Sequence, residues 1–305
     1  MNKEFLDLAE QLKSSVSCTV RLNELMSGHT SFKIGGPADI LVLPESIEQV
    51  REVVKVVKET VVPLTLLGNG SNVLVRDKGI RGIVIKLGNM LRHFYEAEDL
   101  LVFGSGYSLA LASYKAMECG KTGMEFAVGI PGSIGGAVYM NAGAYDGEMQ
   151  NIVNCVKVMD LQGNERVLTA EELNFGYRKT SLQNSGLIVT EVTLKMPSGN
   201  KDEIKSKMDD FSHRRISKQP LEMPSAGSMF KRPPGYFAGT LIDQAGLKGY
   251  TVGGAQISTK HAGFVVNVGG ATAADVLQLI KDVQTKIKAG VGVELQPEVL
   301  VIGEE

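Results

Sequence analysis

One hydroxyl group, that of Ser228, lies in the segment PSAGSMFKRPPG, between small residues and a basic, proline-rich tail. It could serve as a nucleophile, a phosphate ligand, a proton donor or part of a turn. A nucleophilic serine needs a neighbouring base, and this segment lacks the G-x-S-x-G elbow that often carries such a serine. The histidines of the chain stand in unrelated contexts: His29, His93, His213 and His261. We therefore set the nucleophile aside, while the other three uses stay open.

Two further charged residues have types suited to carboxylate chemistry. Arg178, in FGYRKTSL, can bind a carboxylate through two parallel hydrogen bonds, which the neighbouring Lys179 cannot match. Glu298, in LQPEVLVIG, is a single acid between a proline and an apolar run. Without further context, such an arginine is more often a surface residue, and the glutamate is as readily a carboxylate at a strand end.

Two glycine-rich stretches are candidates for binding a phosphate group. The first, LLGNGSNVLV, begins like a dinucleotide-binding turn, but Val73 replaces the third glycine, and no GxxxxGK[ST] loop occurs elsewhere. What remains is a set of small residues whose backbone N–H groups can face an anion. They are Gly68, Asn69, Gly70, Ser71 and Asn72 in the first stretch, and Gly129, Gly132, Ser133, Gly135, Gly136, Asn141 and Gly143 in the second. Together they suit a diphosphate held by backbone and hydroxyl groups rather than by Lys or Arg.

The composition is that of an ordinary globular protein. With 305 residues the chain can form two or three domains, and its net charge of −2 gives no reason to expect a nucleic acid partner. Three widely spaced cysteines, Cys18, Cys119 and Cys155, favour a reduced compartment without disulfides or zinc. The N-terminus lacks the apolar core of a signal peptide, and no run reaches the roughly 18 apolar residues of a membrane helix. We therefore expect a cytoplasmic protein with no metal, no membrane and no obligate protein partner.

The apolar pattern predicts three successive units that position these candidates. Strands are expected within 38–46, 63–68, 82–87, 151–173, 186–196 and 295–303, a strand followed by a helix within 101–120, and helices at 46–60 and 272–290. Gly290 is expected to end the last helix. The charged segment 197–220 carries Ile204, Met208 and Phe211 about one helical turn apart. We interpret it as a solvated surface helix between domains rather than as part of a site.

Seven segments form an ordered set along the chain. They are SFKIGGPADILVLPES, PLTLLGNGSNVLVRDKGIRGIVIKL, GMEFAVGIPGSIGGAVYMNAGAYDGEM, FGYRKTSL, AGSMFKRP, GTLIDQAGLKGYTVGGAQISTKHAGFVVNVGGAT and GVELQPEVLVIGE. In content and order they resemble the UDP-N-acetylenolpyruvoylglucosamine reductase family of bacterial cell-wall synthesis. The resemblance runs from about residue 29 to the C-terminus.

The resemblance implies a fold and a cofactor. The fold is α+β, with an FAD-binding domain of the vanillyl-alcohol-oxidase/p-cresol-methylhydroxylase type, built from two α+β subdomains, and a C-terminal α+β substrate-binding domain. Its expected parts are 1–90 together with the terminal strand 299–305, then 91–217, then 218–298. The two glycine-rich stretches would hold the FAD diphosphate and line the isoalloxazine. Some related flavoenzymes attach FAD through a histidine, but only His93 is near these stretches and it lies outside both, so we expect non-covalent FAD.

The resemblance also implies a reaction, the NADPH-dependent reduction of UDP-N-acetylglucosamine enolpyruvate to UDP-N-acetylmuramate. Hydride passes from NADPH to the flavin and then to the enolpyruvyl alkene, so negative charge builds on the α carbon and its carboxylate. Such a step needs a cation or proton donor at the carboxylate and an acid for the α carbon. In the family's pattern Arg178 binds the carboxylate and stabilises the enolate, Glu298 is its partner, and Ser228 is the general acid.

The implied substrate contacts are basic, and one family feature is missing. Lys218 and Lys248 match positions that face the UDP diphosphate, with Lys231 and Arg232 as further candidates. Some members carry an inserted loop whose tyrosine closes over the substrate, but residues 179–217 contain no tyrosine, so the chain resembles the shorter subclass. Two alternatives remain: another FAD-dependent oxidase or dehydrogenase of the superfamily, or a non-catalytic nucleotide-sugar binder.

Overall fold

The computed structural model describes residues 3–60 and 62–305. The chain divides into two compact units. Unit 1 consists of Met1–Leu22, Ile40–Asn69 and Gly82–Arg215, and unit 2 of Asn23–Asp39, Gly70–Arg81 and Ile216–Glu305. The predicted division into 1–90 with 299–305, 91–217 and 218–298 stays a prediction. Residues 1, 2 and 61, which fall in its first part, lie outside the described residues.

Unit 1 contains two sheets and most of the helices. Its strands are β1 (Thr19–Leu25), β2 (Pro37–Leu43), β3 (Leu64–Leu67), β5 (Ile80–Lys86), β6 (Phe94–Ala97), β7 (Leu100–Gly104), β8 (Gly143–Ala144), β9 (Gly147–Glu148), β10 (Val153–Met159), β11 (Glu165–Thr169) and β12 (Ile188–Lys195). Its helices are α1 (Lys3–Ser15), α2 (Ile47–Glu59), α3 (Leu109–Glu118), α4 (Ile134–Tyr139) and α5 (Lys201–Lys218), with 3-10 turns η2 (Glu125–Ala127) and η3 (Met149–Asn151). Four of these elements extend past the unit boundary, because residues 23–25 of β1, 37–39 of β2, 80–81 of β5 and 216–218 of α5 fall in unit 2. The sheets have the orders β1-β2-β5-β3 and β11-β10-β12-β7-β6, and the pair β8-β9 forms a small hairpin.

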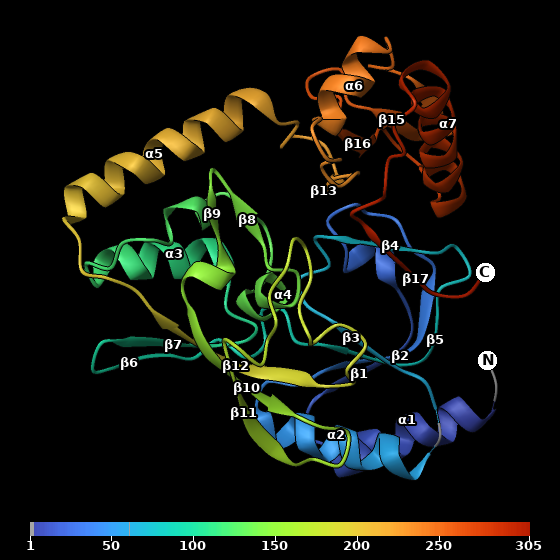
Figure 1. Cartoon of the computed structure of the whole chain (residues 1–305). Coiled ribbons are helices and arrows are strands. Elements are labelled where there is room, and N and C mark those ends of the chain that lie inside the picture. The colour runs from blue at the N-terminus through green and yellow to red at the C-terminus, as the bar shows by residue number, and fades with distance from the viewer. Residues whose placement is uncertain (1–2, 61) are drawn as a thin grey trace. The chain divides into compact units, whose positions relative to one another are not determined.

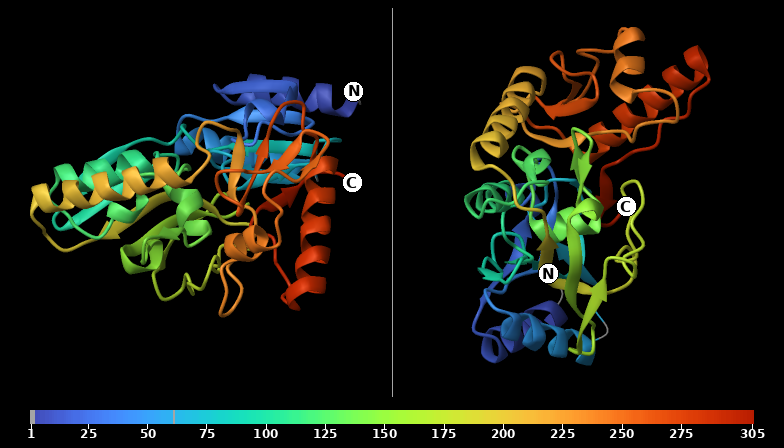
Figure 2. Two further views of the ribbon diagram at one scale, coloured as in Figure 1. Left: turned by 90° about the horizontal axis from the view of Figure 1, so that it is seen from above. Right: turned by 60° about the vertical axis from the view of Figure 1, so that its left-hand side comes forward.

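Helix α2 is specified by an N-terminal cap and by an apolar face. The Ser46 hydroxyl accepts a hydrogen bond from the Gln49 N–H at 3.2 Å, which satisfies an otherwise unpaired donor of the first turn. Valines at helical spacing, among them Val50, Val53 and Val54, are buried in a core shared with α1 and the first sheet. Figures 1 and 2 show the two blue helices side by side. The helix predicted at 46–60 is confirmed.

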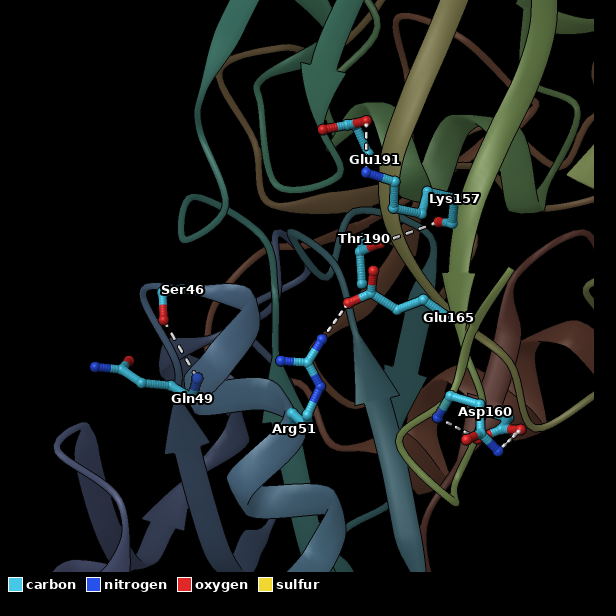
Figure 3. A network of polar contacts seen from close by, with 9 residues as sticks. Ser46, Gln49, Arg51, Lys157, Asp160, Glu165, Thr190 and Glu191 are labelled. Carbon is cyan, nitrogen blue, oxygen red and sulfur yellow. Dashed lines mark hydrogen bonds and ion pairs between the residues drawn. The ribbon is translucent and has the colours of Figure 1, made fainter. Parts of the chain in front are cut away.

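Polar contacts hold α2 and the second sheet of unit 1 in place (Figure 3). Arg51 of α2 forms an ion pair with Glu165 of β11. On β12, Glu191 is only 8% exposed and lies 3.4 Å from the Lys157 ammonium and 3.0 Å from His93 Nε2. A buried carboxylate needs such partners, because an unpaired charge in the interior is costly.

The second sheet of unit 1 packs against α3 and α4, and all three share one hydrophobic core. Strand β12 pairs antiparallel with both β10 and β7. Phe103, Leu109, Ile134 and Val192 are fully buried between the sheet and these helices. The strand–turn–helix predicted within 101–120 and the strands predicted within 151–173 and 186–196 are therefore confirmed.

Helix α5 is confirmed where the charged segment was predicted to be helical. Ile204, Met208 and Phe211 are its buried residues, and they pack on Val128, just before the second glycine-rich stretch. Asn200 caps the helix by accepting from the Asp202 N–H at 2.9 Å. Its inner face is thus covered, and only its outer face is solvated.

Unit 2 is a smaller α+β body. Its elements are η1 (Met26–Gly28), β4 (Val73–Val75), β13 (Ser225–Ser228), β14 (Thr251–Val252), β15 (Ala255–Ile257), β16 (Phe264–Asn267), β17 (Leu300–Ile302), α6 (Ala238–Gln244) and α7 (Ala273–Val291). The sheet order is β13-β16-β15-β14, and β17 pairs in parallel with β4. Val276, Ile280 and Val283 of α7 pack into one core with this sheet, and Figure 2 shows the red helix beside the orange strands.

In the described residues, no helix is long and apolar enough to cross a membrane.

The two ends of α7 differ in how well the sequence predicted them. At the start, the Thr272 hydroxyl and the Asp275 carboxylate form a capping box, and Asp77 accepts from the N–H groups of Ala273 at 2.7 Å and Ala274 at 2.9 Å. At the end, the prediction of Gly290 as terminator is wrong, because the helix runs to Val291 and Gly292 takes the left-handed conformation, with φ of 75°. A helix ends where the left-handed residue stands, and a glycine in the last turn alone only weakens it.

Candidate functional site

The first residues of the two glycine-rich stretches meet within unit 1. A Cβ atom placed on Gly68 would lie 2.7 Å from Ser133 Oγ, so only glycine fits at this contact. Ser133 is buried, and its hydroxyl caps α4 by accepting from the Gly136 N–H at 3.3 Å. The loop after β3 and the turn before α4 therefore face each other closely, as two walls of one ligand cradle would.

A third segment, the turn after β7, completes this part of unit 1. The Gly135 N–H donates to the Ser105 carbonyl at 2.9 Å, and the Ile134 N–H to the Tyr107 carbonyl at 2.9 Å. A Cβ on Gly135 would lie 2.8 Å from Ser105 Cβ, so the two backbones touch. The sequence showed a glycine turn here, but gave no reason to assign Ser105 to a site.

Two buried polar atoms in these segments lack partners. Asn69 Oδ1 and Ser105 Oγ are inaccessible to solvent and accept or donate no hydrogen bond among residues 3–60 and 62–305. Leaving such an atom unsatisfied costs about 1–3 kcal/mol, so native proteins keep few of them without a ligand or an ion. A polar ligand with both donors and acceptors, such as FAD, fits these two atoms and the glycine-lined approach to them.

The remaining residues of the first stretch lie in unit 2 and are fixed by backbone contacts. Gly70 has φ of 68°, and a Cβ there would lie 2.3 Å from the His29 carbonyl oxygen. Asn72 donates from Nδ2 to the Glu298 carbonyl at 3.3 Å and accepts from the Leu300 N–H at 3.1 Å. Ser71 stands between them, half-buried. This half of the stretch thus leads directly to Glu298.

Asn141 has a structural place in the second stretch. Its side chain is fully buried, donates from Nδ2 to Glu148 Oε2 and to the Gly176 carbonyl, each at 3.0 Å, and accepts from the Gln150 N–H at 3.0 Å. Both amide N–H groups are therefore used inside the protein. The structure places Asn141 as a support for the loop that Gly143 continues.

Arg178 lies against that same loop. It occupies a tight turn between Gly176 and Lys179 with φ of 55°, a conformation uncommon for residues other than glycine. Its Nη1 donates to the Asn141 carbonyl at 3.3 Å and its Nη2 to the Gly143 carbonyl at 3.2 Å. The Tyr177 ring lies 5.0 Å from the guanidinium carbon. Backbone and ring contacts thus orient the guanidinium next to the second glycine-rich stretch.

Ser228 and Glu298 are neighbours in unit 2. The Glu298 N–H donates to the Met229 carbonyl at 2.8 Å, and Phe230 pairs antiparallel with Pro297. Ser228, the last residue of β13, is exposed, and Glu298 is half-buried. The structure therefore brings together two of the three predicted catalytic residues, although they are seventy positions apart in the sequence.

The predicted substrate-binding cations are placed differently from one another. Lys248 lies 2.7 Å from Asp243, and the guanidinium carbon of Arg232 lies 4.0 Å from the centre of the Phe237 ring. Burial lowers the pKa of His261, and the positive charges of Lys248 and Lys218 lower it further. The sequence analysis did not select His261. Lys231, half-buried, donates its backbone N–H to the Gln296 carbonyl at 2.8 Å.

Comparison with known proteins adds family information to this geometry. Residues 38–169 match a family model described as an FAD binding domain, and residues 219–302 one described as the C-terminal domain of UDP-N-acetylenolpyruvoylglucosamine reductase. A UDP-N-acetylenolpyruvoylglucosamine reductase of Clostridium perfringens is 50% identical over 99% of this chain and 98% of its own length. The enzyme of that name from Clostridioides difficile is 48% identical over 94% of each chain.

A solved structure extends the likeness to the fold. The crystal structure of UDP-N-acetylenolpyruvylglucosamine reductase from Thermus caldophilus matches with a TM-score of 0.78 and 38% identity, over 93% of this chain and 98% of that one. The expected α+β fold, with an FAD-binding domain and a reductase-type C-terminal domain, is confirmed. With such identity over nearly its whole length, the chain belongs to the UDP-N-acetylenolpyruvoylglucosamine reductase family.

Proposed function

We propose that the chain is an FAD-dependent, NADPH-consuming oxidoreductase that reduces UDP-N-acetylglucosamine enolpyruvate to UDP-N-acetylmuramate. The reaction belongs to peptidoglycan precursor synthesis, which places the protein in the cytoplasm. The observation that carries the proposal is the meeting of Gly68 with Ser133, beside the unpartnered atoms Asn69 Oδ1 and Ser105 Oγ. This cradle lies in the part of the chain that matches the FAD binding domain.

The residues that would hold FAD come from both glycine-rich stretches. In unit 1 these are the backbone groups around Gly68, Gly129, Gly132, Ser133, Gly135, Gly136 and Gly143, and in unit 2 those of Gly70, Ser71 and Asn72. Bound FAD would supply the hydride transfer that no side chain can perform. We propose that FAD is held without a covalent bond, because His93 Nε2 is engaged with Glu191 at 3.0 Å.

Arg178 would bind the carboxylate of the enolpyruvyl group. Two of its N–H groups orient the guanidinium on backbone carbonyls. A guanidinium fixed in this way can face a planar carboxylate without losing further rotamer freedom. It would also stabilise the negative charge that develops there during reduction.

Ser228 would donate the proton to the α carbon, and Glu298 would assist. An alcohol is a weak acid, so its hydroxyl must be held where the proton is needed. The β13 backbone supplies this hold, because Ser228 pairs with Phe264 of β16 and Met229 accepts from the Glu298 N–H. Glu298, whose N–H donates to the Met229 carbonyl, lies beside the end of β13 and would assist Ser228 or supply a proton itself.

Four cations would bind the sugar nucleotide. The charges of Lys218 and Lys248 both lower the pKa of His261, and we propose that both lysines bind the UDP diphosphate. Lys231 and Arg232 stand three and four positions after Ser228 and would contact the same ligand. We keep the three-part division at residues 90 and 217 as a proposal. The family match that begins at residue 219 supports the boundary at 217, whereas the match at 38–169 spans the boundary at 90.

The test is a purification followed by one kinetic comparison. The protein should carry a yellow chromophore that is released intact by denaturation, and NADPH consumption should depend on the enolpyruvyl sugar nucleotide. Oxygen-dependent NADPH consumption without this substrate would instead indicate an oxidase of the superfamily. Flavin that NADPH fails to bleach would indicate a non-catalytic binder, and either result contradicts the proposed reaction.

A further inference from the structure

Arg215, on the inner face of α5, has a buried nitrogen without a partner. Its Nε is inaccessible to solvent and forms no hydrogen bond within residues 3–60 and 62–305. Burial lowers the pKa of this guanidinium. The preceding residue shows the ordinary alternative, since Arg214 is exposed and pairs with Asp210 at 2.7 Å. Arg215 is therefore a half-buried cation whose Nε, among the described residues, has no partner of the kind that Asp210 provides for Arg214.

The side chain of Arg215 lies directly on the second glycine-rich stretch. A Cβ atom on Gly129 would stand 2.5 Å from Arg215 Cδ and 3.4 Å from Nε. Gly129 has an ordinary negative φ, so its backbone conformation does not require glycine. Glycine is required there because the Arg215 side chain occupies the space that a Cβ atom would need. The stretch therefore leaves room for this guanidinium.

The hairpin β8-β9 holds this part of α5 in place. The Tyr145 ring stacks on the Phe211 ring at 4.4 Å with 12° between the planes, and its hydroxyl donates to the Phe211 carbonyl at 3.3 Å. Phe211 and Arg215 are four residues apart on one face of the helix. Tyr145 and Asp146 both have positive φ, 50° and 63°, as expected for the two central residues of a tight hairpin turn. Figure 1 shows the hairpin beneath α5.

We propose that Arg215 binds a negatively charged oxygen of the FAD at the second glycine-rich stretch. A buried guanidinium N–H without an acceptor is unfavourable, and an anionic ligand oxygen next to it removes that cost. FAD has two sources of such an oxygen: its diphosphate, and the pyrimidine edge of the isoalloxazine, which gains negative charge on reduction. The inference rests on the proposed FAD binding, and it replaces the expectation that no Lys or Arg contributes to holding the cofactor.

The experiment compares Arg215→Met and Arg215→Lys with a matched control, Arg214→Met, one residue away on the same helix. FAD affinity is measured by titrating each apoprotein and following flavin fluorescence. If Arg215 binds the diphosphate, losing this charge-assisted hydrogen bond should raise the Kd for oxidised FAD at least about tenfold in Arg215→Met. Arg215→Lys should lie between it and the wild type, and Arg214→Met should bind FAD as the wild type does.

Two further measurements distinguish the source of the anion. If the diphosphate is bound, ADP affinity falls together with FAD affinity in Arg215→Met, while riboflavin affinity and the midpoint potential stay unchanged. If the reduced ring is bound, the affinity for oxidised FAD changes little and the midpoint potential becomes more negative, by about 30 mV for each tenfold loss of affinity for the reduced form.

The stability of the apoprotein separates ligand binding from a packing role. Removing an unpaired buried charge should leave the Tm of apo Arg215→Met equal to or above that of the wild type, whereas added FAD should raise it less. If Arg215→Met instead loses Tm equally with and without FAD, and keeps its Kd and midpoint potential, Arg215 is only structural and the inference is wrong. A wild-type protein that binds no FAD at all would refute the proposed function first.

Discussion

The contact between Asp77 and the start of α7 provides a quantitative test of how unit 2 is held together. The first three N–H groups of this helix are all satisfied by side chains: those of Ala273 and Ala274 by Asp77, and that of Asp275 by Thr272. Asp77 belongs to the loop after β4, far from α7 in sequence. Replacing it should therefore loosen the helix without disturbing the helix's own capping box.

The expected loss of stability on replacing Asp77 follows from these two hydrogen bonds. Removal of one helix-capping side chain costs typically about 1 kcal/mol, and here one carboxylate serves two donors at 2.7 and 2.9 Å. Its charge adds a favourable interaction of about 0.3–1 kcal/mol with the helix dipole. We expect Asp77→Ala to cost about 2 kcal/mol. Asp77→Asn, which keeps one acceptor oxygen and loses the charge, should cost about half as much.

Hydrogen exchange of the backbone amides of α7 measures this loss of helix stability directly. A loss of about 2 kcal/mol raises the population of the opened helix, and with it the exchange rate, about 30-fold. Lys78→Ala, the neighbouring exposed residue, is the matched control and should exchange like the wild type. Equal exchange rates for Asp77→Ala and the wild type, or for Asp77→Ala and Asp77→Asn, would show that the carboxylate does not support the helix as argued.

Three further results are expected. Ser228→Ala should leave flavin reduction by NADPH intact and slow the substrate half-reaction by about 10²–10⁴-fold in stopped-flow absorbance, since it removes only a proton donor; equal slowing of both halves would contradict the role. Arg178→Lys should lower kcat/KM about 10- to 100-fold in steady-state assays, because an ammonium cannot reproduce the planar contact, while Lys179→Met should not. Burial raises the pKa of the Cys18 and Cys119 thiols to about 11, so below that pH both stay protonated. At pH 8 they should react with iodoacetamide about 100-fold more slowly than in the unfolded chain, and reaction at the unfolded rate would refute the burial argument.

The sequence predicted best where local and long-range signals agree. Ser46 and the buried valines of α2 specify its start and its inner face, and Ile204, Met208 and Phe211 specify the inner face of α5. Their periodicity arises from burial against a single neighbour, so it can be read along the chain. The two glycine-rich stretches were found in the same way, through local residue types.

Other features depend on contacts that no local pattern records. Asn141 has the composition of a ligand residue, but its amide is used by Glu148 and by the backbone of Gly176. Arg215 looks like one more charge on a charged helix, and only its position on Gly129 sets it apart. The end of α7 depends on which of two nearby glycines takes a left-handed φ. The residue type cannot decide this, because it is the same at both positions.

The parallel pairing of β17 with β4 has a consequence for the order in which the chain can fold. Residues 300–302 are the neighbours of residues 73–75, and Arg76 forms an ion pair with Glu305 at 2.8 Å. Unit 2 is built from three separate stretches of chain, the last of which runs from Ile216 to Glu305. The pairing of β17 with β4 therefore cannot form until residues 300–302 have been made, whereas all residues of unit 1 have been made by Arg215. Such distant pairing slows folding, so during synthesis the unit that carries Ser228 and Glu298 closes after unit 1 has been made.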